Sequence, residues 1–178
     1  MLHVRPERPE DRSAVEALFD RTFGPDRHRR TSYRYRDGLP PLKELCLVAE
    51  LDGRPVGAVR FWPVRLDRRP ALLLGPLAIE PALHGRGIGR RLVREALARA
   101  RTRGWRLVFL VGDPPYYRRF GFRPVPPGIV MPGEDPGRLL WRRLGRGGMP
   151  RRGVLRRAEA PVAHAGAPAA LDAVGGGP

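Results

Sequence analysis

The sequence predicts a single α/β domain whose mixed, twisted sheet has parallel strands at its centre and helices on both faces. Two apolar runs, residues 71–79 and 107–111, have the length and composition of strands that are covered on both faces. Between them, residues 88–103 have the apolar spacing of an amphipathic helix, and Gly104 ends it. Two such strands joined by a helix form a βαβ unit, whose strands lie parallel in one sheet.

The chain begins with three shorter elements. Residues 2–5 predict a strand that Pro6 ends. Residues 9–23 predict a helix with acidic residues in its first turn and apolar residues along one face. Residues 26–37 are polar and fit either a second helix or a loop.

Two antiparallel connections are expected before the βαβ unit. Residues 45–51 and 56–66 predict strands, and the Asp-Gly-Arg-Pro turn at 52–55 is a strong hairpin signal. A second turn at residues 67–70 leads into the first strand of the unit. Pro76 inside that strand has no N–H to donate, so it predicts a bulge or a local break.

A glycine-rich turn with Gly85, Gly87 and Gly89 precedes the central helix. The first-turn N–H groups of a helix lack intrahelical partners, and the helix dipole adds partial positive charge, so an anion is expected there. Three arginines add formal charge to the same turn: Arg86, Arg90 and Arg91. The turn lacks the Lys-Ser/Thr of a P-loop and the last glycine of the dinucleotide fingerprint. A tight turn with glycines for packing alone is the alternative.

Beyond the βαβ unit the elements are short. Residues 112–115 predict a turn that opens a short helix at 116–120, and Phe122 begins another strand. Residues 124–136 hold many prolines and glycines and predict an irregular loop.

The last predicted strand is residues 139–144. From residue 145 onward the composition turns to Gly, Ala, Pro and Arg without a periodic apolar pattern. Such a segment buries too little apolar surface to order itself. We therefore expect a domain at residues 1–144 and a disordered, basic tail at residues 145–178.

The composition is strongly basic, with 34 Lys and Arg against 18 Asp and Glu and a net charge of +16. Such charge fits a nucleic-acid partner, but the arginines are spread along the chain and no zinc-finger, RNP or helix-turn-helix pattern is present. No apolar run reaches membrane-spanning length, and the charged N-terminus lacks a secretory signal. Cys46 is the only cysteine and cannot form an internal disulfide. We therefore expect a cytoplasmic protein without a membrane partner.

Two segments resemble the GNAT superfamily of N-acetyltransferases. Residues 84–89, His-Gly-Arg-Gly-Ile-Gly, resemble its acetyl-CoA-binding motif Q/R-x-x-G-x-G/A. Gly87 and Gly89 stand on the motif glycines, whereas His84 stands where Gln or Arg is usual. Residues 116–122, Tyr-Tyr-Arg-Arg-Phe-Gly-Phe, resemble the family's Y-x-x-x-G-F segment. The resemblance covers roughly the first 144 residues and indicates a GNAT-like fold of an uncharacterised bacterial subgroup.

The resemblance implies acetyl-CoA as cosubstrate, no metal, and transfer of the acetyl group to an amine. In this family the backbone beside the motif glycines holds the CoA pyrophosphate, and a bulged central strand contacts the pantetheine and acetyl groups. The matching positions are the expected cofactor-binding residues: Leu77, Ala78, Ile79, His84, Gly85, Arg86, Gly87, Ile88, Gly89, Arg90 and Arg91.

Tyr117 matches the family's tyrosine that faces the departing thiolate, and it is the expected general acid. A core aromatic is the alternative for Tyr117, and Tyr116 beside it could exchange roles with it. For the general base, Glu80 after the central strand is a weak candidate, His28 is a second, and a water chain is a third. The histidines are scattered and no carboxylate pair has ligand spacing, so no metal site is expected.

Two other function classes stay open at this stage. One is a non-catalytic acyl-CoA-binding module, which a missing general base would favour. The other is a basic nucleic-acid-associated protein, which binding without CoA would favour. The acceptor stays open between small amines and protein amines, and the oligomeric state is equally open.

Overall fold

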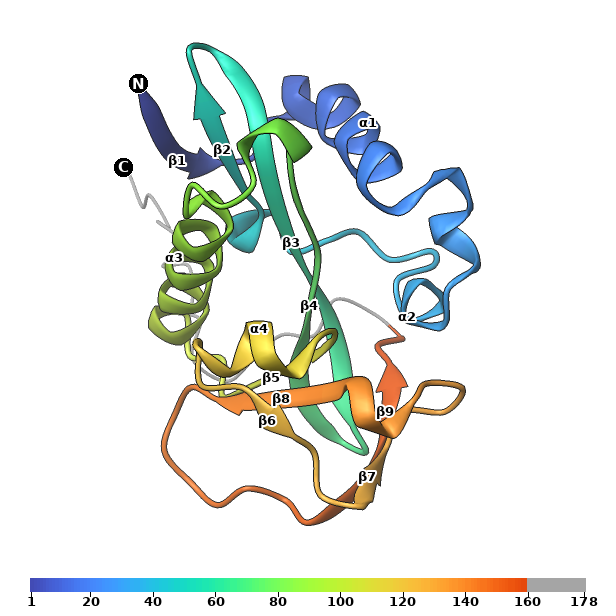
Figure 1. Ribbon diagram of the computed structural model, residues 1–178. Helices are drawn as coiled ribbons and strands as arrows, with labels where there is room; N and C mark the ends of the chain where they lie inside the picture. The colour runs from blue at the N-terminus through green and yellow to red at the C-terminus, as the bar shows by residue number, and fades with distance from the viewer. Residues whose placement is uncertain (160–178) are drawn as a thin grey trace, which may run out of the picture.

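The computed structural model describes residues 1–159, so residues 160–178 of the expected tail lie outside the described residues. Its sheet has the strand order β1-β2-β3-β4-β5-β8-β6, while β9 pairs with β3 and with β7 (Figure 1). The β4–β5 and β7–β9 pairs are parallel, and the other pairs are antiparallel. The strands are β1 (Leu2–Pro6), β2 (Leu47–Leu51), β3 (Arg54–Leu66), β4 (Arg69–Ile79), β5 (Leu107–Val111), β6 (Arg123–Pro124), β7 (Gly128–Val130), β8 (Leu139–Arg143) and β9 (Arg152–Arg157).

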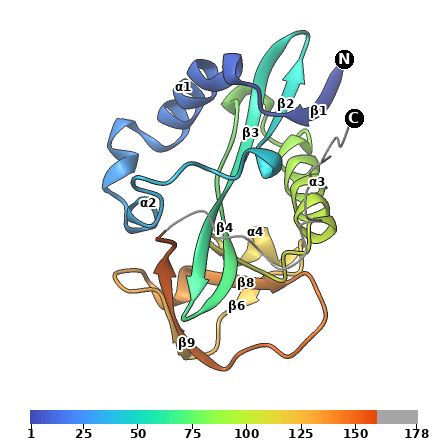
Figure 2. The ribbon, with the colours of Figure 1, turned by 180° about the vertical axis from the view of Figure 1, so that it is seen from behind.

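Helices cover both faces of this sheet, as expected. Short 3-10 turns accompany α1 (Arg12–Phe23), α2 (Thr31–Arg34), α3 (Ile88–Thr102) and α4 (Pro114–Arg118). Alternate residues of β2 and β3 point to opposite faces: Val48 and Ala58 pack against α1, whereas Leu47 and Val59 pack with α3. Figures 1 and 2 show α1 and α3 on opposite sides of β3 and β4. No helix within residues 1–159 is both long and apolar enough to cross a membrane.

The predicted βαβ unit and hairpin are confirmed. β4, α3 and β5 follow one another, and β4 pairs in parallel with β5. The β2–β3 turn places Asp52 at φ 49° and Gly53 at φ 78°, the left-handed pair that tight hairpins need. The polar stretch after α1 forms a 3-10 turn at Pro25–Arg29 and the single-turn α2.

The centre of the sheet splits open on one side of a bulge. The β4–β5 ladder contains only Leu72↔Val108 and Leu73↔Phe109, so the rest of β4 has no partner on that edge within residues 1–159. On its other edge the β3–β4 register shifts, and Gly75 and Pro76 lie opposite a single β3 residue. This bulge confirms the prediction made from Pro76.

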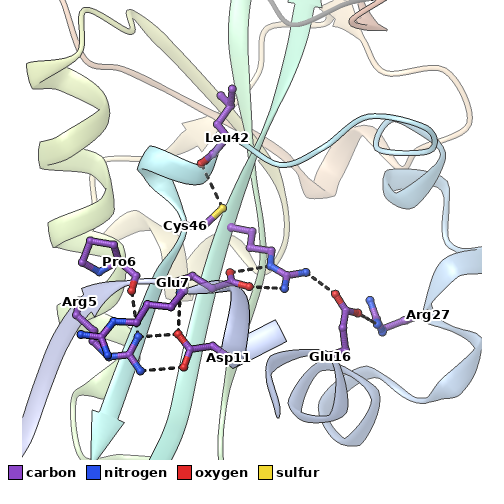
Figure 3. Close-up of polar contacts among 10 residues, drawn as sticks. Arg5, Pro6, Glu7, Asp11, Glu16, Arg27, Leu42 and Cys46 are labelled. Atoms are coloured by element: carbon purple, nitrogen blue, oxygen red, sulfur yellow. Dashed lines mark hydrogen bonds and ion pairs between the residues drawn. The ribbon is translucent and has the colours of Figure 1, made fainter. Parts of the chain in front are cut away.

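An ion-pair network joins α1 to β3 and to Glu7, the residue that follows β1. Arg60 of β3 donates to both carboxylate oxygens of Glu7, at 2.9 and 2.5 Å, and to Glu16 of α1. Glu16 also accepts a hydrogen bond from Arg27, which is 4% exposed (Figure 3). A second pair in the same view links Arg5 bidentately to Asp11, at 2.6 and 2.8 Å.

The C-terminal region departs from expectation. The strand at 139–144 is not the last one, because β9 pairs with β3 through Val64↔Arg157, Arg65↔Arg156 and Leu66↔Leu155. Leu155 is 1% exposed, so the fold extends beyond residue 144, and the disorder expected from residue 145 is wrong for β9. The loop expected at 124–136 also contains the short strand β7, which pairs with β9. β9 was missed because it fully buries only one apolar side chain, which gives no alternating pattern, and β7 was missed because it is only three residues long.

Candidate active site

One cleft of about 410 Å³ lies where the N-terminus of α3, the second half of β4 and α4 meet. It brings together the two segments that carry the family resemblance, although they are separated by a helix and a strand in the sequence. All predicted cofactor-binding residues except Arg86 and Arg91 line it. The lining residues are Thr22, Leu77, Ala78, Ile79, Leu83, His84, Gly85, Gly87, Ile88, Gly89, Arg90, Tyr116, Tyr117 and Arg119.

A cationic depression of about 520 Å³ adjoins this cleft. It contains the two remaining predicted residues, Arg86 and Arg91, together with Arg94 and one acid, Glu95, of the next helical turn. The cleft and the depression share Gly85, Gly87 and Arg90. Positive side chains therefore surround the same helix end at which the dipole already favours an anion.

The glycine turn is required for two different reasons. Gly87 is the N-cap of α3 and has φ 79°, a left-handed conformation that side chains disfavour, while its surroundings are open. Gly89 has no such φ, but a Cβ atom there would lie 2.9 Å from the Tyr116 hydroxyl oxygen and 3.4 Å from Ile79 Cγ1. A side chain at residue 89 would therefore require the Tyr116 hydroxyl to move away from the start of α3.

The open edge of β4 presents backbone groups to the cleft. Glu80 N–H donates to Val56 of β3 at 2.8 Å, so by antiparallel alternation the Leu77 and Ile79 amides point away from β3. The Ile79 carbonyl accepts a hydrogen bond from His84 Nε2 at 3.1 Å. His84, which departs from the family motif, thus ties the glycine turn back onto β4.

Tyr117 is held on the opposite wall of the cleft. Asp113 caps α4 by accepting a hydrogen bond from Tyr116 N–H at 3.3 Å, and two prolines fill the first helical positions. The Tyr117 ring meets the Tyr116 ring edge-on, with centroids 4.9 Å apart, and the Phe122 ring at 5.9 Å. Burial raises the pKa of Tyr117 above its ordinary value of 10.0, and Tyr116 and Asp113 raise it further. The phenol is therefore protonated at neutral pH and can donate a proton.

Tyr116 differs from its neighbour in environment. The Arg119 guanidinium lies over the Tyr116 ring, 5.0 Å from its centroid. Burial raises the pKa of Tyr116, while Arg119 and Arg90 oppose the shift. Its hydroxyl lies against Gly89 at the helix end, so Tyr116 faces the glycine turn.

The two side chains weighed as general bases do not line the cleft. The Glu80 carboxylate accepts a hydrogen bond from Arg21 of α1 at 3.0 Å and ties α1 to the end of β4. His28 is exposed and packs its ring against Tyr33, 5.2 Å between centroids.

Three cleft residues were missed in the sequence: Thr22, Leu83 and Arg119. Arg119 lies inside the second family-like segment, so that segment could have indicated it. Thr22 reaches the cleft because α1 packs across β4, which no local pattern indicates. Within residues 1–159, no group of three or more His, Cys, Asp or Glu side chains could hold a metal ion.

Comparison with known proteins identifies one family. The family model described as Acetyltransferase (GNAT) family matches residues 12–122. The uncharacterized N-acetyltransferase YhbS of Escherichia coli (strain K12) is 36% identical over 123 residues, which are 67% of this chain and 72% of that protein. The uncharacterized N-acetyltransferase YjhQ of the same organism is 36% identical over 84 residues, 45% of this chain and 46% of that protein.

Solved structures share the architecture. The crystal structure of YhbS from Escherichia coli in complex with CoA has a TM-score of 0.74 and 28% identity, covering 89% of this chain and 90% of that one. A GNAT family acetyltransferase from Brucella melitensis in complex with acetyl-CoA has a TM-score of 0.66 and 34% identity, covering 89% of this chain and 97% of that one.

Proposed function

The chain belongs to the GNAT family of acetyltransferases. We propose that its cleft transfers the acetyl group of acetyl-CoA to an amine. The observation that carries the proposal is the meeting of the glycine turn, the open edge of β4 and Tyr117 in one cleft. These parts supply an anion site, backbone dipoles and a proton donor, which are the needs of acetyl transfer.

In this proposal the CoA pyrophosphate binds at the N-terminus of α3. The first-turn amides after Gly87 donate to its oxygens, and Arg90 adds positive charge inside the cleft. Arg86 and Arg91 in the adjoining depression contribute longer-range attraction.

The acetyl group lies along the open edge of β4. The N–H groups of Leu77 and Ile79 point away from β3 and are not used in the β3–β4 ladder. One of them can therefore donate a hydrogen bond to the thioester carbonyl and polarise it. The amine lone pair attacks the carbonyl carbon, the C–N bond forms and the C–S bond breaks. Tyr117 gives its proton to the CoA sulfur, the amine nitrogen loses its proton to water, and water returns a proton to the Tyr117 phenolate. The products are the acetylated amine and free CoA.

We also propose that the protein acts in the cytoplasm. The Cys46 thiol is buried, and burial raises its pKa to about 12, so it stays an unreactive thiol that donates to the Leu42 carbonyl at 3.2 Å. Such a thiol suits a reducing compartment. Cell fractionation tests this assignment, and recovery from an exported fraction would contradict it.

Calorimetry with acetyl-CoA, followed by a free-thiol release assay against a panel of amines, tests the activity. We expect binding of acetyl-CoA and thiol release that depends on both substrates. Binding without thiol release for any amine would indicate an acyl-CoA-binding module instead. Retention of nucleic acid with no acetyl-CoA binding would support the nucleic-acid alternative.

A further inference from the structure

Arg36 is a buried cation that lacks an anion. Its side chain follows α2, is 8% exposed, and has Nε and Nη1 fully buried with no hydrogen-bond partner among residues 1–159. The other two buried arginines of this region are paired: Arg60 with Glu7 and Glu16, and Arg27 with Glu16 and Asp20. Arg36 alone among these three has no carboxylate.

The surroundings of Arg36 hold it in place without neutralising it. Its guanidinium lies over the Tyr33 ring, 4.4 Å from the centroid. Burial lowers its pKa to about 10, and the positive charge of Arg27 lowers it further, whereas Tyr33 opposes the shift through its charge interaction and a side-chain hydrogen bond with the guanidinium. The group therefore remains charged at neutral pH inside an environment that disfavours charge.

Arg36 lies at the point where the sheet opens. Its Nη2 is 3.1 Å from where a Cβ atom of Gly75 would stand, so the absent side chain makes room for the guanidinium. Gly75 is in the bulge, two residues after the last β4–β5 pair, Leu73↔Phe109, and two residues before Leu77 of the cleft. The guanidinium thus lies beside the bulge, next to the end of β4 that lines the cleft, although Arg36 itself is not among the lining residues.

A second unpartnered donor comes from the same face of the sheet. Trp62 Nε1 is buried with no hydrogen-bond partner in residues 1–159, and Trp62 pairs with Leu73 of β4. Trp62 shares its face of β3 with Arg60, whose guanidinium lies 5.2 Å from the Phe19 ring of α1. That face is the one under α1 and α2, opposite α3.

Unsatisfied buried donors of this kind are costly unless a bound group completes them. A carboxylate has two oxygens, accepts bidentate hydrogen bonds from a guanidinium, and carries the single negative charge that one unpaired arginine can neutralise. We propose that Arg36, with Trp62 on the same face of the sheet, binds a carboxylate of the amine acceptor, so that the acceptors are amino acids or similar amino carboxylates. This inference rests on the proposed acetyl transfer. The carboxylate takes no part in that transfer and only positions the amine.

Matched pairs of acceptors test the inference on the wild-type protein. The pairs are alanine with alaninamide, leucine with leucinamide and phenylalanine with phenylalaninamide, in the thiol release assay. We expect kcat/KM at least tenfold higher for the acids, mainly through a lower KM. The amides have the less basic amine, so more of it is deprotonated and this bias opposes the expected preference. Equal or better use of the amides would overturn the inference.

Two variants test whether Arg36 causes the preference for amino acids over their amides. Arg36→Met should reduce the acid-to-amide ratio to about one, whereas Arg34→Met, which removes an exposed arginine of α2, should keep it. A folded Arg36→Met protein with the full preference would overturn the inference. If Arg36→Met does not fold, the wild-type pairs still decide. 2-Aminoethyl phosphate is a further arm, and its preference over the amino acids would contradict a carboxylate site.

A stability measurement separates this inference from the proposed function. Acetyl-CoA should raise the melting temperature of the wild type and of both variants equally, because it binds the native state in the cleft, whose lining includes neither Arg36 nor Arg34. A protein that acetyl-CoA does not stabilise, or that releases no thiol with any amine, would fail as an acetyltransferase. A protein that acetylates amines with no acid preference would fail only as an amino-carboxylate enzyme.

Discussion

The ring of Tyr117 lies directly on the backbone of Gly112. A Cβ atom at residue 112 would be 2.6 Å from Tyr117 Cε2, a distance that real Cβ atoms essentially never show, and 3.0 Å from Cδ2. Gly112 follows the last residue of β5, so the end of the strand sets where the phenol stands. The position of the proposed general acid therefore depends on a missing side chain five residues earlier.

Gly112→Ala should displace the Tyr117 ring and slow acetyl transfer. A shift of about 1 Å in a catalytic group costs about 10²-fold in rate, and overpacking costs about 1–3 kcal/mol of stability. The thiol release assay gives kcat, and thermal unfolding gives the stability. Gly148→Ala is the control, because a Cβ atom there meets nothing within 4 Å. An unchanged kcat for Gly112→Ala would mean that the ring position is not critical.

Arg90→Glu should weaken acetyl-CoA binding. It reverses a charge that lines both the cleft and the adjoining depression. A lost charge-assisted hydrogen bond is worth about 1.5–3 kcal/mol, so the Kd should rise about 10- to 100-fold, as calorimetry would measure. Arg103→Glu at the other end of α3 makes the same change in net charge and should leave the Kd nearly unchanged. Equal effects of both substitutions would point to bulk charge rather than to a phosphate site.

Ending the chain after Leu144 should destabilise the protein, because it removes β9. Leu155 is 1% exposed and packs with the core around β3, and a buried leucine contributes about 1.5–3 kcal/mol. A chain that ends after Glu159 keeps every described contact and is the control. Denaturant unfolding of the two chains measures the difference. Equal stabilities would show that β9 contributes nothing to the fold.

Two arginine-paired acids, Asp11 and Glu16, predict a loss of stability in acid. Hydrogen bonds from Arg5 lower the pKa of Asp11 against the opposing effect of burial. Burial would raise the pKa of Glu16, but hydrogen bonds from Arg60 and Arg27 outweigh it and lower the pKa. Because both folded-state pKa values are lowered, this stabilisation is complete above the ordinary values of 3.8 and 4.5 and is lost as pH falls below them.

Glu16→Gln isolates one contribution to that acid sensitivity. The free energy of unfolding of this variant should be lower than that of the wild type at pH 7 and should fall less steeply below about pH 4.5. Glu10→Gln, at an exposed acid of the preceding 3-10 turn, is the control. An unchanged slope for Glu16→Gln would contradict a role of the ion-pair network in acid unfolding.

Local patterns predicted most of the fold. The apolar runs of β4 and β5, the glycine turn before α3 and the Asp-Gly hairpin each follow from a few neighbouring residues. Pro76 indicated the bulge because a proline removes one ladder hydrogen bond wherever it stands. The cleft followed from the resemblance of two short segments, although their meeting depends on the splitting of β4 from β5.

Features that depend on distant contacts were missed. β9 buries only Leu155 completely and is held by β3, about 90 residues earlier, so its sequence resembles an unfolded tail. Arg36 lies in a polar stretch whose charges would ordinarily be solvated. Only the packing of α2 under the bulge makes it a buried cation. Contacts of this range leave no local signal in the sequence.

The proposed mechanism depends on Tyr117 as the general acid, and the pKa of Tyr117 gives a first test of this role. Burial raises this pKa, so the phenol stays protonated beyond its ordinary value of 10.0. Ionisation of Tyr117 should therefore cause no fall in kcat below about pH 10. A decline in kcat with a midpoint near pH 8 would contradict the raised pKa of Tyr117. The same decline in Tyr116→Phe would show that ionisation of Tyr116 is not its cause.

The turnover of Tyr117→Phe at saturating acetyl-CoA is the most direct test of Tyr117 as the general acid. The substitution keeps the ring that packs on Gly112 and removes only the proton donor, so acetyl-CoA affinity and stability should be retained. We expect kcat in the thiol release assay to fall about 10²- to 10⁴-fold, the usual worth of a general acid, while Tyr116→Phe changes it much less. A Tyr117→Phe protein that turns over at the wild-type rate would contradict the proposed mechanism.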